Sequence, residues 1–158
     1  MSKSVPGAPL ARYAAWKRRG DFIFLSGVIA VDAATGSVVS GYADLPEEVR
    51  GKLGQTGELS IDVFEGPIAA QSWFVLDRIR VLMEEAGGSM SDVFKLVHYF
   101  KDLRDYPGFA RVRKTFFPEE PPVSTVVEVS GMLPGRGVLV EVEATAYLPA
   151  RRNLSSGS

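Results

Sequence analysis

The sequence has no cysteine and a single histidine, His98, among its 158 residues. Without cysteine the chain can form no disulfide, no thiolate-ligated zinc site and no cysteine nucleophile, and this absence is typical of proteins of the reducing cytoplasm. One histidine is too few for a metal site built from several histidines, and His98 is the only residue on which a Ser-His-Asp triad could be based. We therefore expect a cytoplasmic protein without a metal centre.

Long apolar runs and a strong net charge are also missing. No apolar run approaches the ~20 residues that cross a bilayer, and the opening MSKSVPGAPLARY shows no apolar core of a signal peptide. The formal net charge is −1, so nothing draws the chain generally to nucleic acid or to an anionic membrane. The chain has two small basic clusters, at 16–20 and 110–114. Without a longer basic stripe, we interpret them as solvated surface and not as phosphate-binding sites. We expect no membrane partner and disfavour nucleic acid.

The composition is that of one soluble globular domain, predicted over residues 1–150. Hydrophobic residues make up 46% and charged residues 23% of the chain, an ordinary balance for this class. The polar stretch 151–158 is predicted to be a disordered tail. Residues 43–63 are the least regular part and are predicted to be an insertion with a short helix that starts near Asp44. A lid over a site is the alternative for this excursion.

Apolar periodicity predicts the remaining elements. Residues 21–31 are apolar at nearly every position and predict a central strand that is buried on both faces. Helical spacing predicts one helix over 66–88, with Pro67 near its start, and another over 104–117. Further strands are predicted over 11–19 (an edge strand), 38–42, 91–103, 123–130 and 137–148.

This order of elements predicts an α+β domain of two layers, in which two amphipathic helices cover one face of a mixed β-sheet. The other face of the sheet carries too much Val, Phe and Tyr to remain in water. A second copy of the protein is the simplest cover for it.

The stretch VLVEVEATAY, residues 138–147, places Glu141 and Glu143 on one face of a strand, ~7 Å apart by strand rise. On an exposed sheet both would simply be solvated. Under a neighbouring subunit, burial would raise a carboxyl pKa towards the range useful for general acid–base catalysis. His98 lies among alternating apolar residues, which favours a packed core imidazole over a catalytic one. From the residues alone, both interpretations of Glu141 stay open.

The sequence resembles the RidA (YjgF/YER057c-type) family in four segments that occur in the same order. The match runs over most of residues 12–147. The resemblance implies a chorismate-mutase-like fold and a homotrimer with three clefts between subunits. The four segments are FIFLSGVIAVDAATGSVV, IAAQSWFVLDRIRVLMEEAGGSMSDVFKLVHYFKDLRDY, FF at 116–117 and LPGRGVLVEVEATAY.

The resemblance assigns roles to particular residues. Tyr13 matches the family's pocket tyrosine, Ser26 the serine of its SG motif and Glu141 its catalytic glutamate. Glu141 and Tyr13 are therefore the expected catalytic residues, and Ser26 is expected to bind substrate.

Three further positions that the family uses to bind substrate carry different residues here. Ser124 stands where deaminase members have an arginine that binds the substrate carboxylate, Val126 replaces a cysteine and Ala110 an asparagine. A hydroxyl cannot replace a bidentate guanidinium. The candidates for a replacement guanidinium are Arg12, Arg111 and Arg113.

Three functions follow from the resemblance. The first is a hydrolase that deaminates small enamines or imines without a cofactor, with the excursion at 43–63 shaping the pocket. The second is a trimeric small-ligand-binding or regulatory protein that has lost catalysis. The third is an activity of the endoribonuclease or translation-inhibitor type, which some family members have been described as having.

Overall fold

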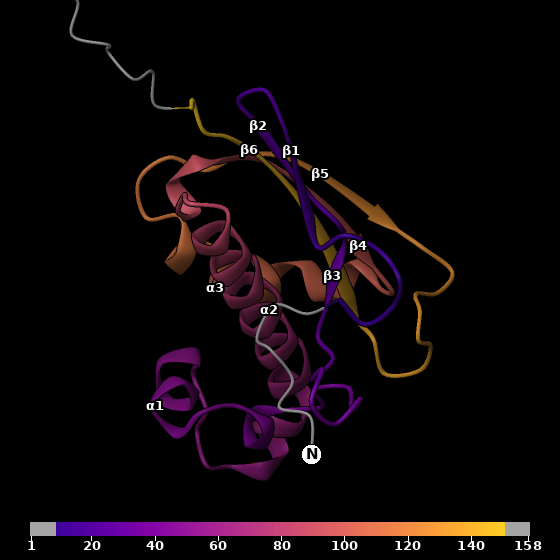
Figure 1. Cartoon of the computed structure of the whole chain (residues 1–158). Helices are drawn as coiled ribbons and strands as arrows, with labels where there is room; N and C mark the ends of the chain where they lie inside the picture. The colour runs from indigo at the N-terminus through magenta and orange to yellow at the C-terminus, as the bar shows by residue number, and fades with distance from the viewer. Residues whose placement is uncertain (1–8, 151–158) are drawn as a thin grey trace, which may run out of the picture.

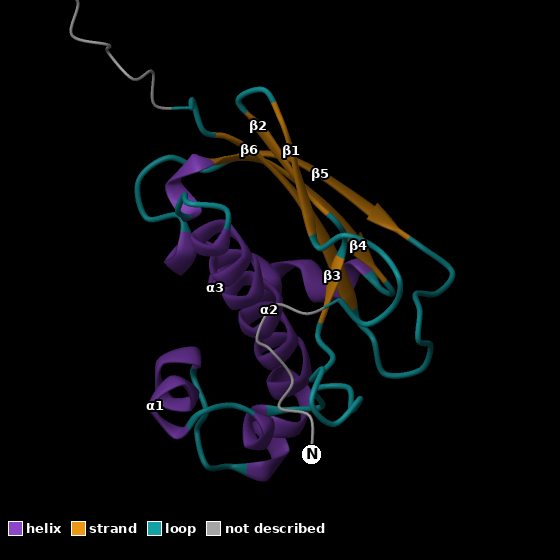
Figure 2. Ribbon diagram, viewed as in Figure 1, coloured by secondary structure: helices purple, strands orange, loops and turns teal. Residues whose placement is uncertain are grey.

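The computed structural model describes residues 9–150, and the tail predicted for 151–158 lies outside them. The described chain forms one six-stranded mixed sheet in the order β1-β2-β6-β4-β5, with β3 also paired to β6. The two long helices, α2 and α3, lie together against one face of this sheet (Figures 1 and 2). This is the predicted two-layer α+β architecture.

The N-terminal strands leave one face of the sheet uncovered. Ile23 and Leu25 are buried, whereas the alternate residues Phe22 and Phe24 are exposed. The predicted burial of 21–31 on both faces is therefore wrong, because the helices cover only one face. The strand predicted over 38–42 is reduced to an isolated bridge between Val31 and Val38. The three strands are β1 (Trp16–Arg19, at the sheet edge), β2 (Phe22–Leu25) and β3 (Val28–Ile29).

The C-terminal strands set the register of the site. β4 lies between β6, to which it is antiparallel, and β5, to which it is parallel. The connection from β5 to β6 therefore crosses beyond β4 and is not a hairpin. A bulge between Val93 and Lys95 buries Val93 and exposes Phe94, whereas uninterrupted alternation from the buried His98 would bury Phe94. The strands are β4 (Val93–Phe100), β5 (Val123–Glu128) and β6 (Val140–Tyr147).

Helix α2 (Leu59–Glu85) is longer than predicted. It begins at Leu59, so Pro67 lies inside it. The Asp62 carboxylate ties the preceding loop to the first turn of the helix, because it accepts hydrogen bonds from the backbone N–H groups of Thr56 (2.8 Å) and Gly57 (2.9 Å). The N-cap residue, Glu58, makes no side-chain capping hydrogen bond within the described chain. The apolar residues of the first turn are exposed, so the sequence shows no amphipathic stripe there from which a helix could be predicted. Its C-terminus agrees with the prediction, because Gly87 follows with φ of 90°.

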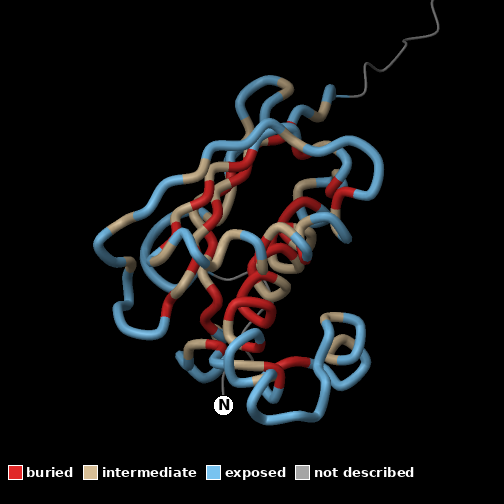
Figure 3. The backbone as a smooth tube through the Cα atoms, turned by 180° about the vertical axis from the view of Figure 1, so that it is seen from behind, coloured by how far each residue is buried: buried red, intermediate tan, exposed pale blue. Residues whose placement is uncertain are grey.

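Helix α3 (Tyr106–Phe116) starts beside Pro107 as predicted and packs on α2. Phe109 and Val112 turn inward from α3 and meet Ile79 of α2 and Phe100 of β4 in the core. Figure 3 shows the buried residues concentrated between the helical layer and the sheet. Two 3-10 turns, η3 (Met90–Asp92) and η4 (Leu103–Asp105), flank β4. No helix within residues 9–150 combines the length and the hydropathy needed to cross a membrane.

The predicted excursion is a compact, structured segment that starts at Tyr42 and ends where α2 begins, and we use the name excursion for these residues, 42–58. Tyr42 and Leu45 bury their side chains, and the Arg50 guanidinium donates to the Leu45 carbonyl at 2.9 Å. The short helix starts at Glu47 after Pro46, later than the predicted Asp44. Figure 1 shows this segment beside the N-terminal end of α2, away from the strands. It comprises η1 (Tyr42–Asp44), α1 (Glu47–Arg50) and η2 (Gly51–Leu53).

Candidate active site

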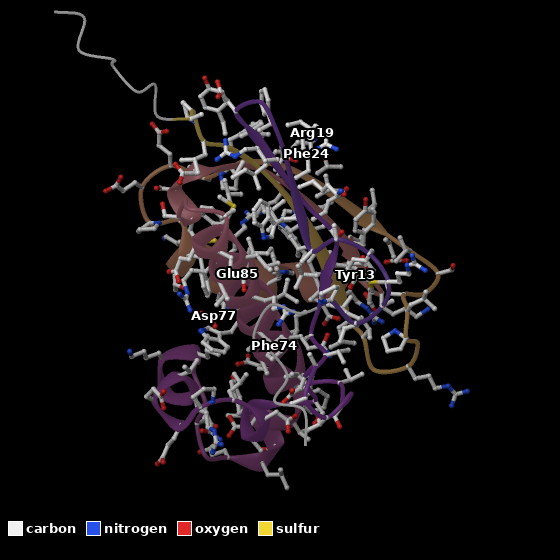
Figure 4. The ribbon with its side chains drawn as sticks, viewed as in Figure 1. Tyr13, Arg19, Phe24, Phe74, Asp77 and Glu85 are labelled. Atoms are coloured by element: carbon white, nitrogen blue, oxygen red, sulfur yellow. The ribbon has the colours of Figure 1, made fainter. Side chains whose placement is uncertain are left out.

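The uncovered face of the sheet carries an open cleft with a volume of about 790 Å³. Its floor comes from β6 and β4, and one wall comes from the loop between β5 and β6. The other wall is formed by Leu10, Ala11, Tyr13, Ser26, Gly27, Ile29 and Val31. In Figure 4, Tyr13 lies beside β3, well along the sheet from Phe24 and Arg19. Polar side chains in the lining come from Tyr13, Ser26, Tyr99, Glu141 and Glu143, and apolar ones from Leu10, Ile29, Val31, Val129, Met132, Leu133 and Pro134.

Glu141 lies in the floor of the cleft, where it is half-buried. It pairs with Tyr99 of β4 on one side and with Ile29 of β3 on the other. Burial raises the pKa of the Glu141 carboxyl, and the neighbouring charge of Glu143 raises it further. The group is therefore moved towards the range in which a carboxylate both accepts and returns a proton near neutral pH.

Gly27 allows Glu141 to occupy this position. A methyl group added to Gly27 would overlap the Glu141 carboxylate oxygen and lie 3.0 Å from its carboxyl carbon. The backbone of Gly27 is thus a wall against which the carboxylate rests, and only glycine leaves that space.

The second glutamate has a different partner. The Tyr99 hydroxyl donates a hydrogen bond of 2.8 Å to Glu143 Oε1. This bond raises the pKa of Tyr99, because it stabilises the protonated phenol next to a carboxylate. Glu143 is therefore held by a neighbour, whereas no hydrogen bond within residues 9–150 engages the Glu141 carboxylate.

Ser26 and Tyr13 belong to one wall of the cleft. The Ser26 hydroxyl donates to the Ala14 carbonyl at 2.7 Å, and its backbone N–H donates to the Ala15 carbonyl at 3.0 Å. These bonds fix the segment that carries Tyr13, whose side chain is 43% exposed and lines the cleft. The hydroxyl hydrogen of Ser26 is thus already used, and only its oxygen remains to accept a hydrogen bond.

The other three expected substrate-binding residues lie on the opposite side of the sheet. Ser124 pairs with Leu96, and Val126 with His98; residues paired in register share a face. Leu96 and His98 are buried on the face that the helices cover. Ala110 lies on α3, in the helical layer. Within one chain, Ser124, Val126 and Ala110 are therefore outside the Glu141 cleft.

His98 is a core residue, as predicted. It is 0% exposed, and its Nδ1 lies 2.9 Å from the Thr125 carbonyl oxygen. A carbonyl only accepts, so Nδ1 carries the proton and the buried Nε2, which has no partner among the described residues, is unprotonated. Ser124 Oγ lies 3.4 Å from the same protonated Nδ1, so His98 cannot act as a base for this serine.

The three candidate arginines have separate environments. Arg113 donates to Ser124 Oγ at 3.3 Å and to the Tyr106 hydroxyl at 3.2 Å, and its guanidinium lies 5.7 Å from the Tyr106 ring centre. Arg111 lines a different cavity, beside the excursion. Arg12 is exposed next to Tyr13. Of the three, Arg113 is the one that lies beside Ser124.

Several cleft residues were not anticipated from the sequence. Tyr99 could have been found, because the alternation of β4 places it on the face opposite His98. The close approach of Gly27 to Glu141 depends on the pairing of β3 with β6. The wall around Met132 and Leu133 depends on the path of the loop between β5 and β6. Neither feature produces a periodic pattern in the sequence. None of residues 43–63 lines this cleft within one chain, so the expectation that the excursion shapes the pocket stays a prediction for the assembled protein.

The contact between Gly27 and Glu141 predicts the outcome of a small substitution. Gly27→Ala should displace the carboxylate, which is the free end of a flexible side chain, with little change in stability. A misplacement of ~1 Å is expected to cost about a hundredfold in turnover at a site that uses this group. Gly131→Ala is the matched control, because it lines the same cleft with open space around the added methyl group. Equal activity of the two variants in any assay of the cleft would contradict the prediction.

A single sheet with both helices on one face, and a cleft with two carboxylates on the other, defines a small α+β protein of the YjgF-like fold. The chain belongs to the endoribonuclease L-PSP family, whose sequence pattern matches residues 48–148, and thus to the RidA/YjgF group that it resembles.

Individual relatives extend over nearly the whole chain. A RutC family protein from Pyrococcus abyssi is 34% identical over 139 residues, 88% of either chain. A 3-aminoacrylate deaminase, RutC from Acinetobacter baylyi, is 27% identical over 89% of this chain and 90% of its own. The solved structure of a candidate endoribonuclease from Klebsiella pneumoniae is 60% identical, with a TM-score of 0.85 over 87% of this chain and 100% of its own.

Proposed function

We propose that the protein is a cofactor-free hydrolase that deaminates small enamines or imines in the Glu141 cleft. The observation that carries the proposal is the half-buried Glu141 carboxylate, which has a raised pKa and rests against Gly27 at the floor of an open cleft. The similarity to a 3-aminoacrylate deaminase supports the same class of reaction.

The chemistry requires one group that both takes and returns a proton. An enamine first takes a proton on its β-carbon and becomes the iminium cation. The Glu141 carboxylate then accepts a proton from a water molecule as the water oxygen bonds to the iminium carbon, which gives a neutral carbinolamine. The protonated Glu141 returns that proton to the nitrogen. The C–N bond then breaks, ammonia leaves, and the hydroxyl proton passes to Glu141 as the carbonyl forms. Glu141 releases this last proton, which balances the one taken up at the β-carbon, so the sum is enamine or imine plus water giving ketone or aldehyde plus ammonia.

The wall residues position the reactants. Tyr13 presents its phenol to the cleft and can donate to the water or to the substrate nitrogen. Ser26, which gives its own proton to the Ala14 carbonyl, can accept from the substrate N–H. Leu133 and Pro134 add apolar surface to the wall, against which the carbon atoms of a substrate can pack.

Arg113 is the proposed anchor for a substrate carboxylate. Its guanidinium is held by two neutral oxygens and has no carboxylate partner within residues 9–150. It lies on the helical side of the sheet, so it can meet Glu141 only if a second copy brings its β5 edge to the cleft of the first. Ser124, Val126 and Ala110 would arrive with it as the remaining substrate contacts.

The uncovered sheet face is suited to such an assembly. Phe22, Phe24, Phe94 and Tyr147 are exposed on it, and Phe22 contacts Phe94 and Tyr147 with ring centres 6.1 Å and 5.4 Å apart. A cluster of this size needs a cover in water. The homotrimer, the cytoplasmic location and the absence of a cofactor belong to this proposal as predictions.

The test is the release of ammonia from 2-aminoacrylate, 2-iminopropanoate and 3-aminoacrylate generated in situ. The proposal expects hydrolysis above the spontaneous rate, in proportion to protein concentration, and its loss in Glu141→Gln. Saturable binding of the corresponding 2-keto acids without turnover would instead favour the non-catalytic ligand-binding function. Cleavage of RNA that survives Glu141→Gln and weakens steeply with salt would favour the endoribonuclease function.

A further inference from the structure

A second cavity lies in the helical layer, between the excursion, α2 and α3. Its volume is about 310 Å³, and none of its lining residues lines the Glu141 cleft. We call it the excursion pocket. The excursion contributes Tyr42, Lys52, Leu53 and Gly54, α2 contributes Glu65 and Ala69, and α3 contributes Gly108, Arg111, Val112 and Thr115.

The floor of the excursion pocket is apolar and closely packed. Tyr42, Ala69 and Val112 are buried, and the Tyr42 ring packs against Gly66 of α2. Gly108 lets α3 approach α2, because a methyl group there would lie 2.9 Å from Ile68. Small residues at this helix contact leave room for a few apolar ligand atoms.

The rim of the excursion pocket is charged. Lys52, Arg111 and Glu65 are exposed around it, and no hydrogen bond or ion pair with another described residue engages their side chains. Burial is the main cause of the raised pKa of the Tyr42 hydroxyl; the charges of Asp62 and Glu65 raise it further, and Arg111 lowers it. Glu65 of α2 and Arg111 of α3 both line the pocket, which places an anion and a cation around the same opening.

We propose that the excursion pocket binds a small α-amino acid, which makes it a ligand site separate from the Glu141 cleft. The ligand carboxylate binds Arg111 and Lys52, because a guanidinium matches a carboxylate in two hydrogen bonds. The ligand ammonium group binds Glu65. A short apolar side chain rests on Ala69 and Val112, and the volume is at the small end of the range of ligand pockets.

The test uses the full chain labelled with ¹⁵N-glycine. Titration with alanine, serine or valine should shift the amide signals of Gly54 and Gly108 to saturation, while Gly131 in the cleft stays unchanged. N-acetylalanine and ethylamine, each lacking one of the two charges, should bind at least about tenfold more weakly, as expected for the loss of a charge-assisted hydrogen bond.

Two substitutions on the exposed rim test the assignment without threatening the fold. Arg111→Gln and Glu65→Gln should each weaken binding at least about tenfold, whereas Lys114→Gln, on α3 but outside the pocket, should leave it unchanged. The proposal is overturned if none of the three amino acids shifts Gly54 and Gly108, or if they bind equally well to Arg111→Gln. Because Glu141→Gln leaves the pocket intact, failure here is distinguishable from failure of the proposed catalysis.

Discussion

Glu141→Gln should lower kcat/KM for imine hydrolysis by at least about a hundredfold, the ordinary contribution of one general acid–base group. Glutamine keeps the size and position of the side chain but cannot accept the proton of the attacking water. The same variant should unfold at a slightly higher temperature at pH 7, because the fold raises the pKa of Glu141 and therefore disfavours its charge. That gain should vanish at acidic pH, where Glu141 is protonated in both states.

Glu143→Gln is the matched control for this prediction. It lies on the same strand face, and its amide oxygen can still accept from the Tyr99 hydroxyl. Removing the Glu143 charge should lower the pKa of Glu141, since that charge contributes to the upward shift. The acid limb of the kcat/KM profile should therefore move to lower pH with little loss at its plateau. Two equally inactive variants, or no shift of the profile, would contradict the role given to Glu141.

His98 should make the stability of the protein strongly dependent on pH in the acidic range. Burial, reinforced by the charge of Arg113, lowers the pKa of His98 from 6.5 to about 4 against the opposing hydrogen bond with Thr125. The contribution of neutral His98 to the free energy of unfolding is complete above pH 6.5. It is lost as the pH falls towards 4, because the histidine of the unfolded chain binds a proton at a higher pH than that of the folded chain. This difference corresponds to about 3 kcal/mol in the free energy of unfolding at pH 4.

His98→Asn separates this effect from other titrations. Its amide can still donate to Thr125, while the smaller side chain should cost about 1–3 kcal/mol at pH 7 through lost packing. The difference in unfolding free energy between wild type and variant, measured in urea at one protein concentration, should then move by about 3 kcal/mol in favour of the variant between pH 7 and pH 4, so that the wild-type advantage disappears or reverses. A constant difference across that range would show that His98 titrates normally and is not buried as described.

The sequence predicts the elements whose periodicity is strong. The stripe of α2 from Ile68 to Met83, the alternation of β6 and the burial of His98 all follow from local pattern. The first turns of α2 do not, because Leu59 and Phe64 are exposed and form no apolar stripe with the rest of the helix. The burial of β2 was overestimated for a related reason, since an apolar run does not reveal how many faces of a sheet are covered.

The candidate site was predicted in part. The expected residues Tyr13, Ser26 and Glu141 come together in one cleft. That Ser124 and Val126 lie on the other face is a consequence of register, which fixes their partners as Leu96 and His98. The close fit of Gly27 against Glu141 arises from pairing between β3 and β6, which no local pattern encodes.

The central claim is that the Glu141 carboxylate of one copy acts on a substrate anchored by Arg113 of another. The decisive measurement is the turnover of mixed assemblies of Glu141→Gln and Arg113→Gln chains, each inactive alone. A trimer with both kinds of chain has one cleft in which an intact Glu141 meets an intact Arg113, so roughly a third of the wild-type rate should return. Mixed assemblies no more active than their inactive parents would contradict the account.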